Sequence, residues 1–117
     1  MSKRQPPGAE KPVDRPADPP DYLDRSAAAE WRRVSAVLAE GGMLSLVDTT
    51  ALAAYCTTFS RWKDAEIKLR EAGPVVKSPS GYPIQNPYLS IANQCLKQMR
   101  SYLVEFGMSP KSRKAVL

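Results

Sequence analysis

The fold is decided by the stretch Asn86–Gly107, which reads NPYLSIANQCLKQMRSYLVEFG. Its apolar residues recur at alternating steps of four and three, which is the period of an α-helix with one buried face. Asparagine is a good helix cap, proline suits the first helical position, and glycine suits a left-handed helix end. The stretch therefore predicts a helix over residues 87–106 that packs antiparallel on a second helix. The apolar face consists of Tyr88, Ala92, Cys95, Met99, Tyr102 and Phe106, with Leu89, Leu96 and Leu103 recurring every seven residues.

The partner helix is expected from about Leu46 to Ala72, some 27 residues or roughly 40 Å at a rise of 1.5 Å per residue. Ser45 and Asp48 form a short version of a capping box at its start. One apolar stripe is expected in the core of the hairpin and contains Leu52, Tyr55, Phe59, Trp62 and Leu69. A second stripe has small side chains that let another helix approach closely, which predicts an interface between copies at Ala51, Ala54, Thr58 and Ala65.

Two shorter elements complete the expected architecture. A helix is expected from about Asp24 to Glu40, capped by Asp24 or Ser26 and ended by Gly41-Gly42. Residues 73–84 are expected to form a two-stranded ribbon, because Ser78-Pro79-Ser80-Gly81 has proline and glycine where a turn needs them. This ribbon is either a plain connector or a contact for DNA or protein. The predicted fold class is all-α, with a short helix and a long antiparallel helical hairpin that carries a small β-ribbon at its tip.

Composition divides the chain into three parts. Residues 1–21 contain six of the 11 prolines and no net charge, which predicts a disordered Pro-rich arm. Residues 22–107 are expected to be a helical oligomerisation domain, because a core this small gains from burying more surface between copies. Residues 108–117 form a basic tail. Its cations Lys111, Arg113 and Lys114 face no acid in the tail, and together with Arg32 and Arg33 they are the candidate nucleic-acid-binding residues.

The net charge of +5 suits a nucleic-acid partner, although it also suits the solubility of a small domain. Catalytic chemistry is largely excluded, because the chain has no histidine, two cysteines and no glycine-rich phosphate loop. We expect no enzyme, no metal and no cofactor. Cys56 and Cys95 are expected to be reduced and buried. The sequence has no run of about 20 apolar residues, so no membrane-spanning helix is expected. The N-terminus has no apolar segment after its charged residues, so no secretory signal is expected.

The end of the predicted hairpin also carries a family resemblance. With Leu44–Asp48 and Ala53–Cys56 upstream, the sequence Gly107-Met108-Ser109-Pro110-Lys111-Ser112-Arg113 resembles the terminase small subunits of tailed bacteriophages, in the branch that ends in Gly-x-Ser/Thr-Pro-x-Ser-Arg. The resemblance spans about Pro20 to Arg113. It implies a protein of the host cytoplasm that binds viral double-stranded DNA at the packaging start. It also implies delivery of that DNA to a large ATPase/nuclease subunit, which the protein regulates, and a ring of about eight to eleven copies.

The sequence leaves two alternative functions open. The chain is alternatively a helical protein–protein adaptor without direct DNA binding. A small nuclease or ATPase is the third reading, and the missing motifs disfavour it. No helix-turn-helix module precedes residue 22, and the helix after Gly41-Gly42 starts too apolar for a recognition helix. DNA contact is therefore expected on the basic tail, on Arg32 and Arg33, or on a surface that only the oligomer forms.

Overall fold

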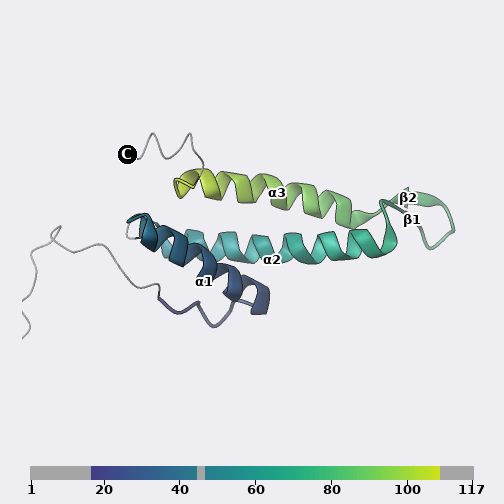
Figure 1. Cartoon of the computed structure of the whole chain (residues 1–117). Helices are drawn as coiled ribbons and strands as arrows, with labels where there is room; N and C mark the ends of the chain where they lie inside the picture. The colour runs from purple at the N-terminus through teal and green to yellow at the C-terminus, as the bar shows by residue number, and fades with distance from the viewer. Residues whose placement is uncertain (1–16, 45–46, 109–117) are drawn as a thin grey trace, which may run out of the picture.

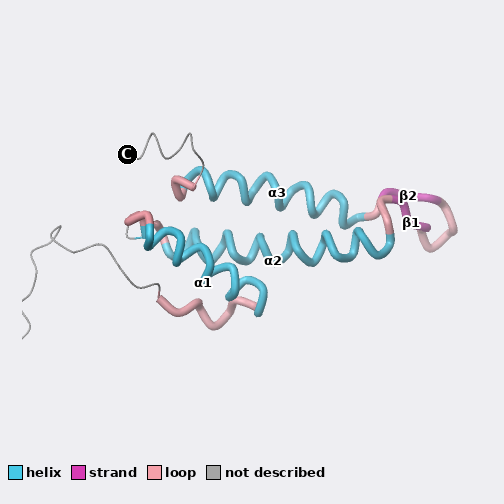
Figure 2. The backbone as a smooth tube through the Cα atoms, viewed as in Figure 1, coloured by secondary structure: helices cyan, strands magenta, loops and turns pink. Residues whose placement is uncertain are grey.

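Three helices and one two-stranded ribbon make up the computed structural model, which describes residues 17–44 and 47–108 (Figure 1). The helices α2 (Thr49–Ala72) and α3 (Pro87–Glu105) form an antiparallel hairpin with the ribbon at one end (Figures 1 and 2). The helix α1 (Arg25–Glu40) packs on α2 over the half of the hairpin away from the ribbon, which we call the near half. The predicted helical architecture with a small antiparallel sheet is confirmed. In chain order the elements are α1 (Arg25–Glu40), α2 (Thr49–Ala72), β1 (Val75–Lys77), β2 (Pro83–Gln85) and α3 (Pro87–Glu105).

Both α1 and α3 end in the same backbone motif. Gly42 and Gly107 have positive φ angles of 68° and 72°, which a residue with a side chain rarely adopts. After each glycine, the next N–H turns back to a carbonyl in the last helical turn, Met43 to Leu38 at 2.8 Å and Met108 to Leu103 at 2.9 Å. This is the pattern of a Schellman cap, in which the residue after the glycine also packs on the helix. The predicted glycine stops are thus confirmed.

The start of α2 differs from the expectation. The helix begins at Thr49 rather than near Leu46, because Asp48 is itself the cap. Its carboxylate accepts hydrogen bonds from the backbone N–H groups of Thr50 at 2.8 Å and Ala51 at 3.4 Å. A side chain that satisfies the first-turn donors must stand outside the helix. Ser45, the other half of the expected capping box, lies outside the described residues.

Asn86 closes the far end of the hairpin. Its side-chain oxygen accepts from the N–H of Tyr88 at 3.0 Å and so caps α3, as predicted. Its side-chain nitrogen donates to the carbonyl of Gly73 at 2.9 Å, just after α2. Its backbone N–H donates to Pro74 at 2.8 Å. One buried residue therefore joins the end of α2 to the start of α3, and the ribbon projects beyond it with Val76 paired to Ile84.

The core of the near half centres on Tyr55, whose side chain contacts all three helices. Its hydroxyl donates to the Glu30 carboxylate of α1 at 2.5 Å. Its ring meets Tyr102 and Phe106 of α3 edge-on, with centroids 6.4 and 6.0 Å away. Burial, aided by the bond to Glu30, raises the pKa of Tyr55, so the hydroxyl remains a donor at neutral pH. Leu52 and Tyr55 are buried as expected, whereas Phe59 and Trp62 are half-buried.

The packed body extends further toward the N-terminus than the sequence predicted. The indole Nε1 of Trp31 donates to the carbonyl of Ala17 at 2.9 Å, and Leu23 is buried in the core. Residues 17–21, which the sequence assigned to the disordered arm, therefore run along the surface of α1 with at least one specific bond. Residues 1–16, for which disorder was predicted, lie outside the described residues.

Replacing Tyr55 with phenylalanine tests the central bond. We expect Tyr55→Phe to lower the free energy of unfolding by about 1–3 kcal/mol, because Glu30 loses a buried hydrogen-bond donor while the ring contacts remain. Urea unfolding followed by circular dichroism at one protein concentration measures the change. The matched control is Tyr82→Phe, whose hydroxyl lies on an exposed ribbon residue and should change stability little. Equal effects of the two variants would contradict this account of the core.

Two N-terminal deletions test where the body begins. Removing residues 1–16 should leave the melting temperature unchanged, because their composition gives them no core residues. Removing residues 1–20 should lower it, because the Trp31 indole then loses Ala17 as its acceptor. Thermal unfolding of both truncated chains beside the full chain decides the matter. Identical melting temperatures for all three chains would show that residues 17–20 contribute nothing to stability.

Candidate nucleic-acid interface

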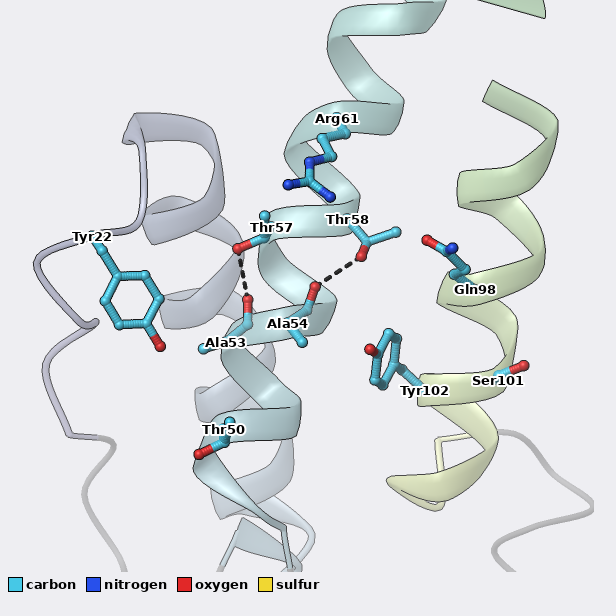
Figure 3. Close-up of a pocket in the computed structure, with 10 residues that line it drawn as sticks. All are labelled: Tyr22, Thr50, Ala53, Ala54, Thr57, Thr58, Arg61, Gln98, Ser101 and Tyr102. Carbon is cyan, nitrogen blue, oxygen red and sulfur yellow. Dashed lines mark hydrogen bonds between the residues drawn. The ribbon is translucent and has the colours of Figure 1, made fainter. Parts of the chain in front are cut away.

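A surface hollow of about 530 Å³, which we call the Arg61 groove, lies where the segment before α1 meets α2 and α3 (Figure 3). The α2 helix forms its floor, Tyr22 stands on one side, and Gln98 and Tyr102 of α3 stand on the other. Arg61 reaches over the groove from α2 (Figure 3). The lining residues are Tyr22, Thr50, Ala53, Ala54, Thr57, Thr58, Arg61, Gln98, Ser101 and Tyr102.

The chemistry of the Arg61 groove suits an anion better than a reaction. Its lining has one cation, no carboxylate and several hydroxyl and amide groups. The hydroxyls of Thr57 and Thr58 donate to backbone carbonyls within α2, at 3.0 and 2.8 Å. The donor groups that the lining offers to a ligand are then chiefly the Arg61 guanidinium, the Gln98 amide and the tyrosine hydroxyls. Arginine, amide and tyrosine donors are the usual contacts to nucleic-acid phosphates. The groove therefore presents donor groups of the kind that contact phosphates.

The exposed side of α3 adds two cations near the groove. Lys97 and Arg100 are both exposed, and the sequence has no acid from Pro87 to Val104. Lys97 lies one turn before Ser101 of the groove lining, and its carbonyl accepts the Ser101 hydroxyl at 3.2 Å. Neither residue was among the predicted DNA contacts. The sequence signal that indicates them is a pair of cations on one helix with no acidic residue close by.

The two arginines selected in α1 have different environments. Arg33 forms two bonds to the Glu30 carboxylate, from Nε at 2.6 Å and from Nη2 at 2.8 Å. Hydrogen bonding to Glu30 raises the pKa of Arg33, so the guanidinium stays charged and paired. Glu30 is 3% exposed, and a buried carboxylate that lost this partner would be strongly destabilising. Arg32 is exposed and is the better candidate for a phosphate contact.

The other predicted sites are placed as follows. Lys111, Arg113 and Lys114 lie outside the described residues. In the stripe of small residues, Thr58 and Ala65 are already buried within the chain, whereas Ala51 and Ala54 are half-buried. Ala54 and Thr58 line the Arg61 groove together with Gln98 and Tyr102 of α3. The predicted role of the stripe between copies is thus left mainly to Ala51 and Ala54 and remains a prediction.

The buried thiols do not form a reactive site. Cys56 and Cys95 are not bonded to each other. Burial raises the pKa of Cys56 to about 12 and also raises the pKa of Cys95, so both are thiols rather than thiolates at neutral pH. In residues 17–44 and 47–108, no group of three or more acidic or cysteine side chains is arranged to bind a metal ion. The helices of this part are also too short or too polar to cross a membrane.

Comparison with known proteins identifies one family. A family model described as "Phage terminase, small subunit" matches residues 27–117. The match covers nearly all of α1, both helices of the hairpin, the ribbon and the basic tail. No curated protein and no solved structure matches the chain.

Proposed function

Because the chain belongs to the phage terminase small subunits, a family that acts in phage DNA packaging, we propose that it binds viral double-stranded DNA where packaging begins. In this proposal the chain has no catalytic activity of its own. It delivers the DNA to the large ATPase/nuclease subunit in the host cytoplasm and regulates that subunit. The family match over residues 27–117 carries the proposal, and a sequence without histidine agrees with a regulatory subunit.

DNA binding is proposed to use phosphate contacts on two surfaces. The first is the Arg61 groove with Lys97 and Arg100 beside it, where the described residues offer cations without a nearby acid on α3. The second is the basic tail, with Lys111, Arg113 and Lys114, to which Arg32 of α1 adds an exposed cation. Such contacts give affinity that depends strongly on salt and little on sequence.

Assembly into a closed ring of about eight to eleven copies is the second part of the proposal. It is supported by apolar side chains that the single chain leaves in solvent on the half of the hairpin beyond α1. Ile67 of α2 and Ile91 and Leu96 of α3 are each more than 40% exposed. Burying them between copies is favourable, because burial of apolar surface drives association. A ring also repeats each cation around the DNA, which raises the total affinity.

A salt titration of duplex DNA binding tests the proposed surfaces. We expect Arg61→Ala/Lys97→Ala and Lys111→Ala/Arg113→Ala/Lys114→Ala each to weaken binding. Each lost phosphate contact should reduce the slope of log affinity against log salt by about 0.9. Fluorescence anisotropy of a labelled duplex between low and physiological salt measures affinity and slope together. Arg32→Ala is measured in the same series, whereas Arg33 is kept because its removal would leave Glu30 unpaired.

The matched control for the groove is Lys63→Ala, which removes a cation from α2 at a different hollow. Lys63 lines a neighbouring hollow, to which Arg61, Asp24 and Asp64 also contribute, but it does not line the Arg61 groove. Its loss should therefore alter DNA affinity less than the loss of Arg61 and Lys97. If the Lys63 variant weakened binding as much as the Arg61 and Lys97 variant, the groove would have no special role. If the wild-type chain did not bind DNA at any salt concentration, the adaptor function would replace DNA binding.

Light scattering tests the proposed assembly. At micromolar concentration the purified chain should have a mass many times its 12.9 kDa. Ile91→Ser/Leu96→Ser should reduce that mass while leaving helicity unchanged, because both side chains are exposed in the single chain. The control Val104→Ser removes an equally exposed apolar residue near the other end of α3. A monomeric wild-type chain would overturn the ring.

A further inference from the structure

An apolar hollow lies between the C-terminal ends of α1 and α3. It measures about 370 Å³, and we call it the cap hollow. The two Schellman caps create it, because each places a methionine after its glycine and the two helices end side by side (Figure 1). Val37 is 37% exposed, and Met43 and Met108 are half-buried. The lining residues are Val37, Leu38, Glu40, Gly41, Met43, Gly107 and Met108.

The surroundings of the cap hollow are acidic. Glu40 lines it, and the exposed Glu105, just before the α3 cap, lines a separate hollow with Asp48 at the same end of the hairpin. Two helices end here, and a helix C-terminus carries a partial negative charge that favours cations. The sequence offers no lysine or arginine in residues 34–60 or 101–108 to balance these charges. Asp48 is also nearby in the chain, but its carboxylate already caps α2.

The segment that follows Met108 has complementary chemistry. Residues 109–117 read SPKSRKAVL, with three cations, no acid and the apolar run Ala115-Val116-Leu117. Their attachment point, Met108, is part of the hollow lining. Nine residues span at most about 30 Å when fully extended, which is enough to leave the surface and return to it. The segment is thus tethered beside a site that offers both an apolar surface and negative charge.

We propose that residues 109–117 dock back onto their own chain, with Val116 and Leu117 in the cap hollow and Lys111, Arg113 and Lys114 toward Glu40, Glu105 and the two helix ends. The docked segment buries Val37, Met43 and Met108. Docking itself does not depend on DNA. If the tail also binds DNA, as proposed above, phosphates and these carboxylates compete for the same three cations.

Methionine methyl resonances report on the docked state directly. The chain has four methionines, of which Met43 and Met108 line the hollow while Met99 is buried in the core. In chains labelled with ¹³C at the methionine methyl groups, ending the chain after Lys114 should shift the Met43 and Met108 signals and leave Met99 in place. A Met43 signal that the truncation does not move would overturn the proposal. The measurement contains no DNA, so its failure is distinct from a failure of DNA binding.

Charge variants test whether the acidic residues hold the tail, and a spin label tests whether the tail docks on its own chain or on a second copy. Glu40→Gln/Glu105→Gln should move the Met43 signal toward its position in the truncated chain, whereas Glu71→Gln at the far end of α2 should not. A nitroxide on Ala115→Cys should broaden Met43 within the same molecule, and the native thiols are too buried to take the label. In a second sample, chains with ¹³C-labelled methionines are mixed with other chains that carry the nitroxide. Broadening of the Met43 signal in this mixture would show docking onto a second copy and would overturn docking within one chain.

Discussion

The bond between the Tyr55 hydroxyl and the buried Glu30 carboxylate is the interaction on which the rest of the structure depends. A charged carboxylate is costly to bury, so α1 can pack on α2 only where Glu30 meets both Tyr55 and Arg33. Because the ring of Tyr55 also touches Tyr102 and Phe106, the same side chain fixes α3 against the pair. One residue thus sets the relative position of three helices. Arg33, which the sequence alone presents as a surface cation, stabilises the core because it pairs with the buried Glu30 carboxylate.

The placement of α1 over only the near half of the hairpin gives the molecule two different ends. Near α1, the helices form a closed core and frame the Arg61 groove. Beyond α1, the hairpin is a pair of helices that leaves isoleucine and leucine side chains in solvent. The proposed surface for an anion and the proposed surface for other copies therefore lie on different stretches of the hairpin.

The features that the sequence predicted correctly depend on neighbours in the chain. Helix periodicity, the Asn86 cap, the glycine stops and the ribbon turn are all decided within a few residues. The features that it missed depend on distant partners. No local sequence pattern shows that Glu30 is buried, that the Trp31 indole bonds to Ala17, or that Thr58 and Ala65 are buried within the single chain. Arg61 was missed for the same reason, since its groove exists only once Tyr22 and Gln98 are brought beside it.

The double role of Asn86 has a consequence for how this protein can change. Because Asn86 binds the end of α2 and caps α3 at once, the two helices are joined directly at the base of the ribbon, without the residues of the ribbon itself. The ribbon turn at Ser78 and Gly81 closes on itself through its own hydrogen bonds. The segment between Pro74 and Asn86 can therefore gain, lose or exchange residues without shifting α2 relative to α3. The tip of the hairpin is in this sense an insertion site, open to variation while the helices below it stay fixed.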